Sequence, residues 1–177
     1  MDIEEMLDRY EAGERNFAWS VNCSKTGLFM IAVDLSGADL SGINLEGAFL
    51  EAARLRNTNL TGANLRGSNM CQINLTGAIL NGADLTGAEG AEASFYDTSF
   101  VRANLSGVEM NQCIFHGANF SHAILRGAIL EYSSFRGANF SNADLREVEG
   151  FYEKIDKAIF CNTIMPDGSI WYDSIGY

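Results

Sequence analysis

The chain has 177 residues and a formal net charge of −11 at pH 7, which suit one modest domain and disfavour direct binding to nucleic acid or an anionic membrane. Hydrophobic residues make up 47 % of the chain, which excludes a disordered acidic tail. The 18 glycines stand beside a single proline, so they indicate neither collagen nor a flexible linker, and the fold has to explain their spacing.

The N-terminal segment, residues 1–16, is predicted to be an amphipathic helix that caps the rest of the domain. Asp2 suits the N-cap position, Glu5 completes a capping box with it, and Gly13 suits the stop. Such a helix would cover exposed backbone edges that otherwise invite aggregation. Its apolar side would consist of Ile3, Met6, Leu7 and Tyr10.

The same N-terminus lacks the basic and apolar regions of a signal peptide, and no apolar stretch approaches the roughly 20 residues of a membrane span. A chain of this length buries a core without disulfides. We therefore expect a cytoplasmic location and reduced cysteines. The four cysteines, which form no Cys-x-x-Cys pair, are Cys23, Cys71, Cys113 and Cys161.

Between residues 31 and 165 the chain repeats with a period of five residues. From residue 35 on, every fifth residue is large and apolar except Gly90 and Gly150; two positions earlier stands a small or β-branched residue, and two positions later Gly occurs in 12 places. Neither a helix nor a strand has this period. A chain that turns a corner every five residues, with Gly relieving the corner, keeps both marked positions inside once the turns stack. A first coil out of this register is predicted upstream from Phe17, Cys23, Leu28 and Val33.

The repeat unit, Ala-Asn/Asp-Leu/Phe-x-Gly, resembles that of the pentapeptide-repeat family over residues 31–165, and residues 158–168 resemble the closing segment of cyanobacterial members. The resemblance implies an all-β fold, a right-handed quadrilateral β-helix solenoid with about 20 residues per coil. With strands about 4.8 Å apart, residues 31–150 would form a rod of roughly 30 Å. We expect a capping helix in residues 1–16, the β-helix in 17–165 and an aromatic cap or tail in 166–177.

A coil of four pentapeptides would sort the sequence into four faces, each with an inward column made of every twentieth residue. Three of these columns are regular and apolar, so we predict that they form the core. In two of them Leu gives way to Phe, and stacked Phe rings would add about 0.5–1.5 kcal/mol per pair. The columns are Leu35, Leu55, Leu75, Phe95, Phe115 and Phe135; Leu40, Leu60, Leu80, Phe100, Phe120, Phe140 and Phe160; and Leu45, Leu65, Leu85, Leu105, Leu125 and Leu145.

The fourth face, which we call the acidic face, carries outward Glu residues but no Lys or Arg, whereas the other faces mix the signs. We predict that it contacts a partner; the alternative is a face that is merely solvated. Gly90 and Gly150 interrupt its column and are predicted to weaken that column rather than to turn the chain. The candidate partner-binding residues are Glu51, Glu89, Glu92, Glu109, Glu131 and Glu149, with Tyr132 and Tyr152.

We find no catalytic, cofactor-binding or metal-binding motif in the sequence. His116 and His122 lack Cys or carboxylate partners at a metal-binding spacing. Cys71 occupies an outward position, whereas Cys113 occupies an inward one and is predicted to be a small core residue. We therefore expect neither an enzyme nor a bound cofactor.

The C-terminal segment is predicted to turn at Pro166-Asp167-Gly168. An aromatic and apolar tail follows this turn. We predict that the tail either caps the last coil or contacts a second copy of the chain in a homodimer. Its candidate contact residues are Trp171, Tyr172 and Tyr177, accompanied by Ile170 and Ile175.

Two functions follow from these features. The first is a non-enzymatic protein-interaction scaffold or regulator, a rigid rod whose acidic face binds a protein with a basic surface. The second comes from the resemblance, because some pentapeptide-repeat proteins of similar size mimic DNA, occupy the DNA saddle of type II topoisomerases such as DNA gyrase, and dimerise through their C-terminal ends. Residues 31–150 carry 13 acids and 7 arginines, a weak net charge for a DNA mimic. We expect no direct binding to nucleic acid or membranes.

Overall fold

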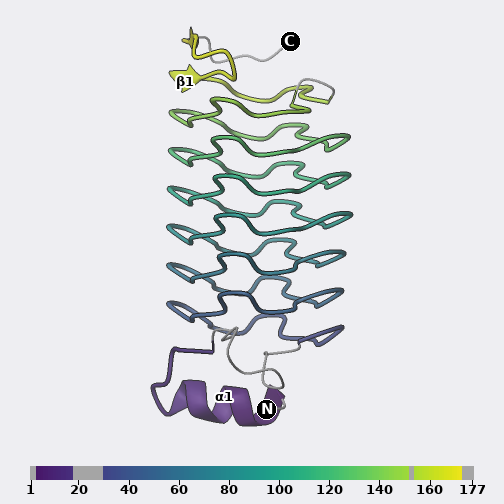
Figure 1. The fold of residues 1–177 in the computed structure, drawn as a ribbon, viewed down its shortest axis with the longest axis vertical. Helices are drawn as coiled ribbons and strands as arrows, with labels where there is room; N and C mark the ends of the chain where they lie inside the picture. The colour runs from purple at the N-terminus through teal and green to yellow at the C-terminus, as the bar shows by residue number, and fades with distance from the viewer. Residues whose placement is uncertain (1–2, 18–29, 152–153, 173–177) are drawn as a thin grey trace.

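The computed structural model describes residues 3–17, 30–151 and 154–172. Its regular elements are helix α1 (Ile3–Glu11) and two short strands, β1 (Thr163–Ile164) and β2 (Ile170–Trp171), which pair in antiparallel fashion. Residues 30–151 wind into a stack of coils, with α1 lying across the N-terminal end of the stack (Figure 1). Within the described residues, no helix is long and apolar enough to span a membrane.

Parallel backbone bridges hold the coils together. In most units two turn residues precede three others, of which the middle one forms the bridge. From the Asp34–Arg54 pair to the Asp144–Ile164 pair, these bridges join residues twenty positions apart. Because two of every five residues turn, no strand grows beyond a single bridge, and the stack itself satisfies the backbone groups.

The inward columns form the core, as the five-residue register predicts. Phe95 stacks on Phe115 with ring centroids 4.7 Å apart, and Phe100 stacks on Phe120 at 4.9 Å, each pair with nearly parallel planes. Rings of neighbouring columns meet at an angle, as Phe115 and Phe120 do at 5.5 Å and 60°. The predicted stacks of Phe side chains are confirmed, and both arrangements are ones that aromatic pairs favour.

Polar side chains satisfy backbone groups on both sides of the coil wall. Inside, buried hydroxyls replace Ala and donate to carbonyls, as Thr98 does to Leu75 O at 2.8 Å. Outside, the Asn or Asp before a column residue accepts the N–H two positions later, as Asn64 does from Arg66 at 3.2 Å. The recurring Asn and Asp residues therefore stabilise the turns.

The 12 glycines placed two positions after a column residue all have positive φ, so they turn the chain as predicted. Gly150 also has a φ of +73°, and a Cβ there would lie 2.6 Å from the Cα and N atoms of Glu131. The prediction that Gly150 does not turn the chain is therefore wrong, because the backbone of the preceding coil leaves no room for a side chain. Gly90 stays in its column, where the Met110 side chain fills the space beside it.

At the N-terminal end, α1 packs on the first coils. Met6 is fully buried, and the Tyr10 hydroxyl donates to Ser41 O at 2.7 Å. The Arg15 guanidinium lies 3.8 Å from the centre of the Tyr10 ring. Buried Phe17 donates its N–H to Asn44 O at 2.8 Å. Asp2 of the predicted capping box, and Cys23 and Leu28 of the predicted first coil, lie outside the described residues.

At the C-terminal end, the predicted turn at Pro166–Gly168 forms, with the Gly168 N–H donating to Met165 O at 2.9 Å. This turn joins β1 to β2, a hairpin that the five-residue pattern does not predict. Trp171 is half-buried and meets the Phe160 ring edge-on at 5.4 Å. The hairpin thereby lays an aromatic ring on the last residue of a Phe column.

Candidate functional site

The acidic face presents its carboxylates to solvent without cationic partners. No ion pair from a basic residue in the described ranges reaches any of its six Glu side chains. A neutral amide contacts Glu92, because Gln72 donates to its Oε2 at 3.2 Å. The six exposed residues are Glu51, Glu89, Glu92, Glu109, Glu131 and Glu149.

Two of these glutamates occupy paired backbone positions on neighbouring coils. Glu89 and Glu109 form a parallel bridge, so their side chains leave neighbouring coils at the same place on the face. Strands paired in this way are about 4.8 Å apart. Like charges placed opposite each other on paired strands destabilise the fold. The stack therefore tolerates a repulsion that a cation from outside would relieve.

The predicted aromatic contacts divide into exposed and half-buried residues. Tyr132 is 60 % exposed at a corner of the acidic face, and Tyr172 is 74 % exposed after β2. Trp171 packs on the core through Phe160. Tyr152 and Tyr177 lie outside the described residues.

The described histidines and cysteines do not form a candidate metal site. Among the described residues, no group of three or more His, Cys, Asp or Glu side chains could hold a metal ion. His122 is exposed on a corner. Cys71 is half-exposed, as its outward position predicts, and Cys113 is buried. Burial raises the pKa of the Cys113 thiol to about 12, and its S–H group donates to Gly90 O at 2.6 Å, so this thiol is a core residue.

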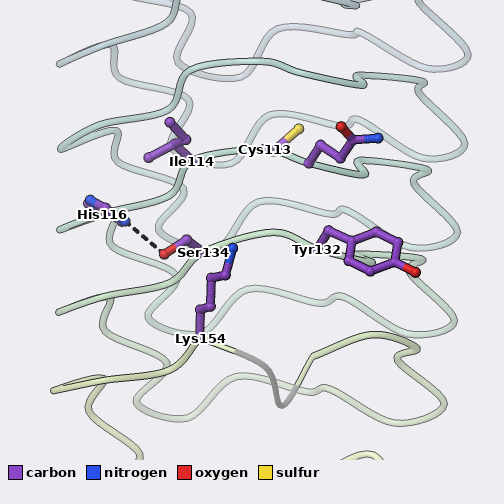
Figure 2. Close-up of a pocket in the computed structure, with 7 residues that line it drawn as sticks. Cys113, Ile114, His116, Tyr132, Ser134 and Lys154 are labelled. Atoms are coloured by element: carbon purple, nitrogen blue, oxygen red, sulfur yellow. Dashed lines mark hydrogen bonds between the residues drawn. The ribbon is translucent and has the colours of Figure 1, made fainter.

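A shallow groove on the flank of the acidic face was not predicted from the sequence (Figure 2). Its volume is about 470 Å³, and its polar groups include a hydrogen bond of 2.7 Å between His116 Nε2 and Ser134 Oγ. Figure 2 shows the Lys154 side chain extending toward the level of Ser134, with Tyr132 on the other side. The lining residues are Gln112, Cys113, Ile114, His116, Tyr132, Ser134 and Lys154.

One sequence signal could have located this groove. Side chains at positions i and i+18 meet repeatedly on the rod, since a turn residue of one coil lies beside a bridge residue of the next. Arg66 and Asp84 form such a pair, as do Asn81 and Ser99. His116 and Ser134 have the same spacing, which becomes visible once the coil size is known.

Among solved structures, the chain is similar to three proteins with pentapeptide-type folds. Rfr23, a pentapeptide repeat protein from the cyanobacterium Cyanothece, is 21 % identical with a TM-score of 0.40, and the match covers 96 % of this chain and 99 % of that one. HetL from the cyanobacterium Nostoc, involved in heterocyst differentiation regulation, is 23 % identical with a TM-score of 0.27, covering 97 % of this chain and 100 % of that one. QnrB1, a plasmid-mediated fluoroquinolone resistance protein, is 20 % identical with a TM-score of 0.39, covering 81 % of this chain and 76 % of that one.

No curated protein sequence matches the chain. The family model for pentapeptide repeats does match, with eight copies over residues 34–72, 72–107 and 113–148. These ranges cover most of the stacked coils and coincide with the five-residue register read from the sequence. The chain therefore belongs to the pentapeptide-repeat family, whose fold is a right-handed quadrilateral β-helix.

Proposed function

We propose that this protein is a non-enzymatic interaction scaffold or regulator whose acidic face binds a protein partner with a basic surface. The face would be presented on a rigid rod of twenty-residue coils, a period that the spacing of the bridges supports. The observation that carries the proposal is the stacked pair of Glu89 and Glu109, exposed and without a cation from the described residues.

The chemistry of the face favours a basic protein surface over other partners. Carboxylates on a rigid support attract Lys and Arg side chains, speed association and lose that attraction as salt is added. Tyr132 adds an exposed aromatic ring beside Glu131, and Tyr is enriched among residues that contribute most to protein interfaces. An Arg or Lys of the partner that reached both Glu89 and Glu109 would also remove their mutual repulsion.

The experiment compares two triple charge reversals that change the net charge equally. The first replaces Glu89, Glu92 and Glu109 on the acidic face with Lys. The second replaces Glu46, Glu147 and Asp156, which are exposed on other faces. Each protein captures partners from an extract of native cells, and the captured protein is then purified for calorimetry.

We expect the acidic-face variant to lose capture and to weaken binding of the purified partner at least about tenfold, while the control variant still binds. Thermal unfolding monitors that both variants fold. Equal binding by the wild type and the acidic-face variant contradicts the proposal. Equal losses in both variants show that net charge alone attracts the partner, which contradicts it as well.

A DNA mimic that modulates DNA gyrase is the alternative, favoured by the six exposed carboxylates that gather on one face. A supercoiling assay with purified gyrase separates the two functions. Inhibition or protection at micromolar protein that the acidic-face reversal abolishes supports the mimic. No effect of the wild-type protein on supercoiling eliminates it.

Two further proposals concern the setting of this function. A homodimer would use the C-terminal end, where Ile170 is 43 % exposed beside the more exposed Tyr172. A monomeric mass in light scattering at micromolar concentration contradicts this arrangement. We also propose that the protein acts in the cytoplasm, which cell fractionation tests directly.

A further inference from the structure

We propose that the groove lined by Lys154, Ser134, His116 and Tyr132 binds a phosphate monoester whose organic group is planar or apolar. The groove is independent of the acidic face in its chemistry, since it offers hydrogen-bond donors and a cation where the face offers carboxylates. Its volume of about 470 Å³ lies within the range of small-molecule sites.

Cations outnumber carboxylates in the three segments that carry His116, Ser134 and Lys154, although the whole chain is strongly acidic. Among residues 113–117, 133–137 and 154–157, the cations are Arg136, Lys154 and Lys157, against one carboxylate, Asp156. That carboxylate lies 3.6 Å from Arg136, which leaves the two lysines. Lys154 forms no ion pair with any residue in the described ranges. A Lys ammonium group binds phosphate as a compact charge with three donors.

The hydroxyl of Ser134 is held in place at one end of the groove. His116 Nε2 and Ser134 Oγ are 2.7 Å apart, and the Tyr96 ring meets the His116 ring edge-on at 5.2 Å. When His116 Nε2 carries the proton, the imidazole donates to Ser134 Oγ, and the hydroxyl proton is free to point into the groove. A phosphate oxygen between Ser134 and Lys154 would then receive two donors from neighbouring coils.

The opposite side of the groove suits the organic part of the ligand. Tyr132 stands at its edge with most of its ring exposed, and Ile114 contributes aliphatic surface. A flat ring can pack against Tyr132 while its phosphate reaches Lys154, because aromatic pairs favour offset contacts. Glu131 precedes Tyr132 and marks where the acidic face begins, so the anionic group belongs at the Lys154 end.

The test is a titration with phenyl phosphate, followed by calorimetry and by amide NMR shifts of residues in the groove. Inorganic phosphate and phenol are the comparison ligands. We expect saturable binding of phenyl phosphate with shifts at Ile114 and Ser134, weaker binding of inorganic phosphate, and none of phenol. Lys154→Met should weaken phenyl phosphate binding about tenfold or more, and Ser134→Ala by a smaller factor. Lys157→Met is the matched control and should leave the affinity unchanged.

Three outcomes overturn the inference: no saturable binding, equal affinity for inorganic phosphate and phenyl phosphate, or an equal loss in Lys157→Met and Lys154→Met. The last would mean that the general positive charge of this region attracts anions. Unchanged amide shifts outside the groove establish that each variant keeps its fold. The triple reversal on the acidic face should retain phenyl phosphate binding, so this inference and the proposed function fail independently.

Discussion

The face built on the third column, which we call the leucine face, is the neighbour of the acidic face. The two faces have the same backbone conformation at their corners but different residues there. Five corners of the leucine face are Gly, with φ between 58° and 66°. Five corners of the acidic face have φ between 55° and 59°, and none of them is Gly. Residues other than Gly are strained at these positive φ values, because their Cβ comes too close to the following carbonyl oxygen. The stacking of coils, and not the residue at the corner, therefore imposes the corner geometry. The leucine-face glycines are Gly47, Gly67, Gly87, Gly107 and Gly127, and the acidic-face residues are Ala52, Gln72, Glu92, Gln112 and Tyr132.

The two faces also treat their charges differently. On the leucine face, Arg66 lies 3.0 Å from Asp84, and Asp144 accepts from both Arg126 and Arg146, at 2.6 Å and 2.7 Å. The acidic face stacks one carboxylate on another with no such partner among the described residues. The charges of the leucine face are therefore paired within the rod, whereas the stacked glutamates of the acidic face remain available to a partner with a basic surface, as we propose.

The two faces should differ most in how much stability is lost when a side chain of the inward column is truncated. Met110 fills its own position and the space beside Gly90, where a Cβ would lie 3.2 Å from Met110 Cγ. Met110→Ala should lower the free energy of unfolding by about 2–5 kcal/mol, near the upper end of that range. Leu105→Ala should lower it less within the same range, because the Leu side chains above and below can relax into the cavity. Chemical denaturation of both variants measures the difference.

Gly90→Ala is the control for this comparison. Its added methyl group would lie 3.2 Å from Met110 Cγ, on a flexible side chain that can shift by a few tenths of an ångström, and the residue has no positive φ, so the change should be small beside that of Met110→Ala. If Leu105→Ala destabilises the protein as much as Met110→Ala does, Met110 does not fill two positions.

Substitutions at the corners should change the free energy of unfolding by an intermediate amount, with opposite signs on the two faces. Gly107 has a φ of +63° with nothing within 4 Å of an added Cβ, so Gly107→Ala should cost about 1–2 kcal/mol from backbone conformation alone. Ala52 has a φ of 55°, and Ala52→Gly should stabilise the protein by about 0.5 kcal/mol, after the greater freedom of Gly in the unfolded chain is subtracted. Urea titrations of the two variants give the comparison. Destabilisation by Ala52→Gly would mean that the non-Gly corners carry no strain.

The sequence predicts the parts of this fold that depend on spacing alone. A five-residue period determines which residues point inward and where the chain turns, so the Leu and Phe columns could be predicted. The turn at Gly150 and the filling of the space beside Gly90 depend on contacts between coils, which the period does not encode. In the β1–β2 hairpin, β1 belongs to the last unit of the register, but its partner β2 follows residue 165, where the pattern has ended.

In the candidate site, too, the features that depend on spacing could be predicted and those that depend on contacts between coils could not. The exposure of the acidic carboxylates could be predicted, because their positions in the repeat are outward. His116 and Ser134 have the spacing of 18 residues that places side chains of neighbouring coils together, but whether they make contact depends on side-chain conformation, which the repeat does not encode. The coil of about 20 residues that the family resemblance implies is enough to pair Glu89 with Glu109, and these two residues form a backbone bridge.

The smallest expected effect is the most direct test of the difference in charge. Glu109→Gln removes the repulsion from Glu89 while keeping the shape of the side chain, and should stabilise the protein by about 0.2–1 kcal/mol. Arg126→Gln on the leucine face removes a cation whose Nε lies 2.6 Å from Asp144 Oδ2, and should destabilise the protein by a similar or smaller amount. Added salt screens both interactions, so both effects should shrink between low and high ionic strength. Making Glu89→Gln and Glu109→Gln together should gain less than the sum of the single changes, because either one already removes the repulsion. Purely additive gains, or a destabilising Glu109→Gln, would mean that the stacked carboxylates do not repel each other and that a basic partner has no such repulsion to relieve.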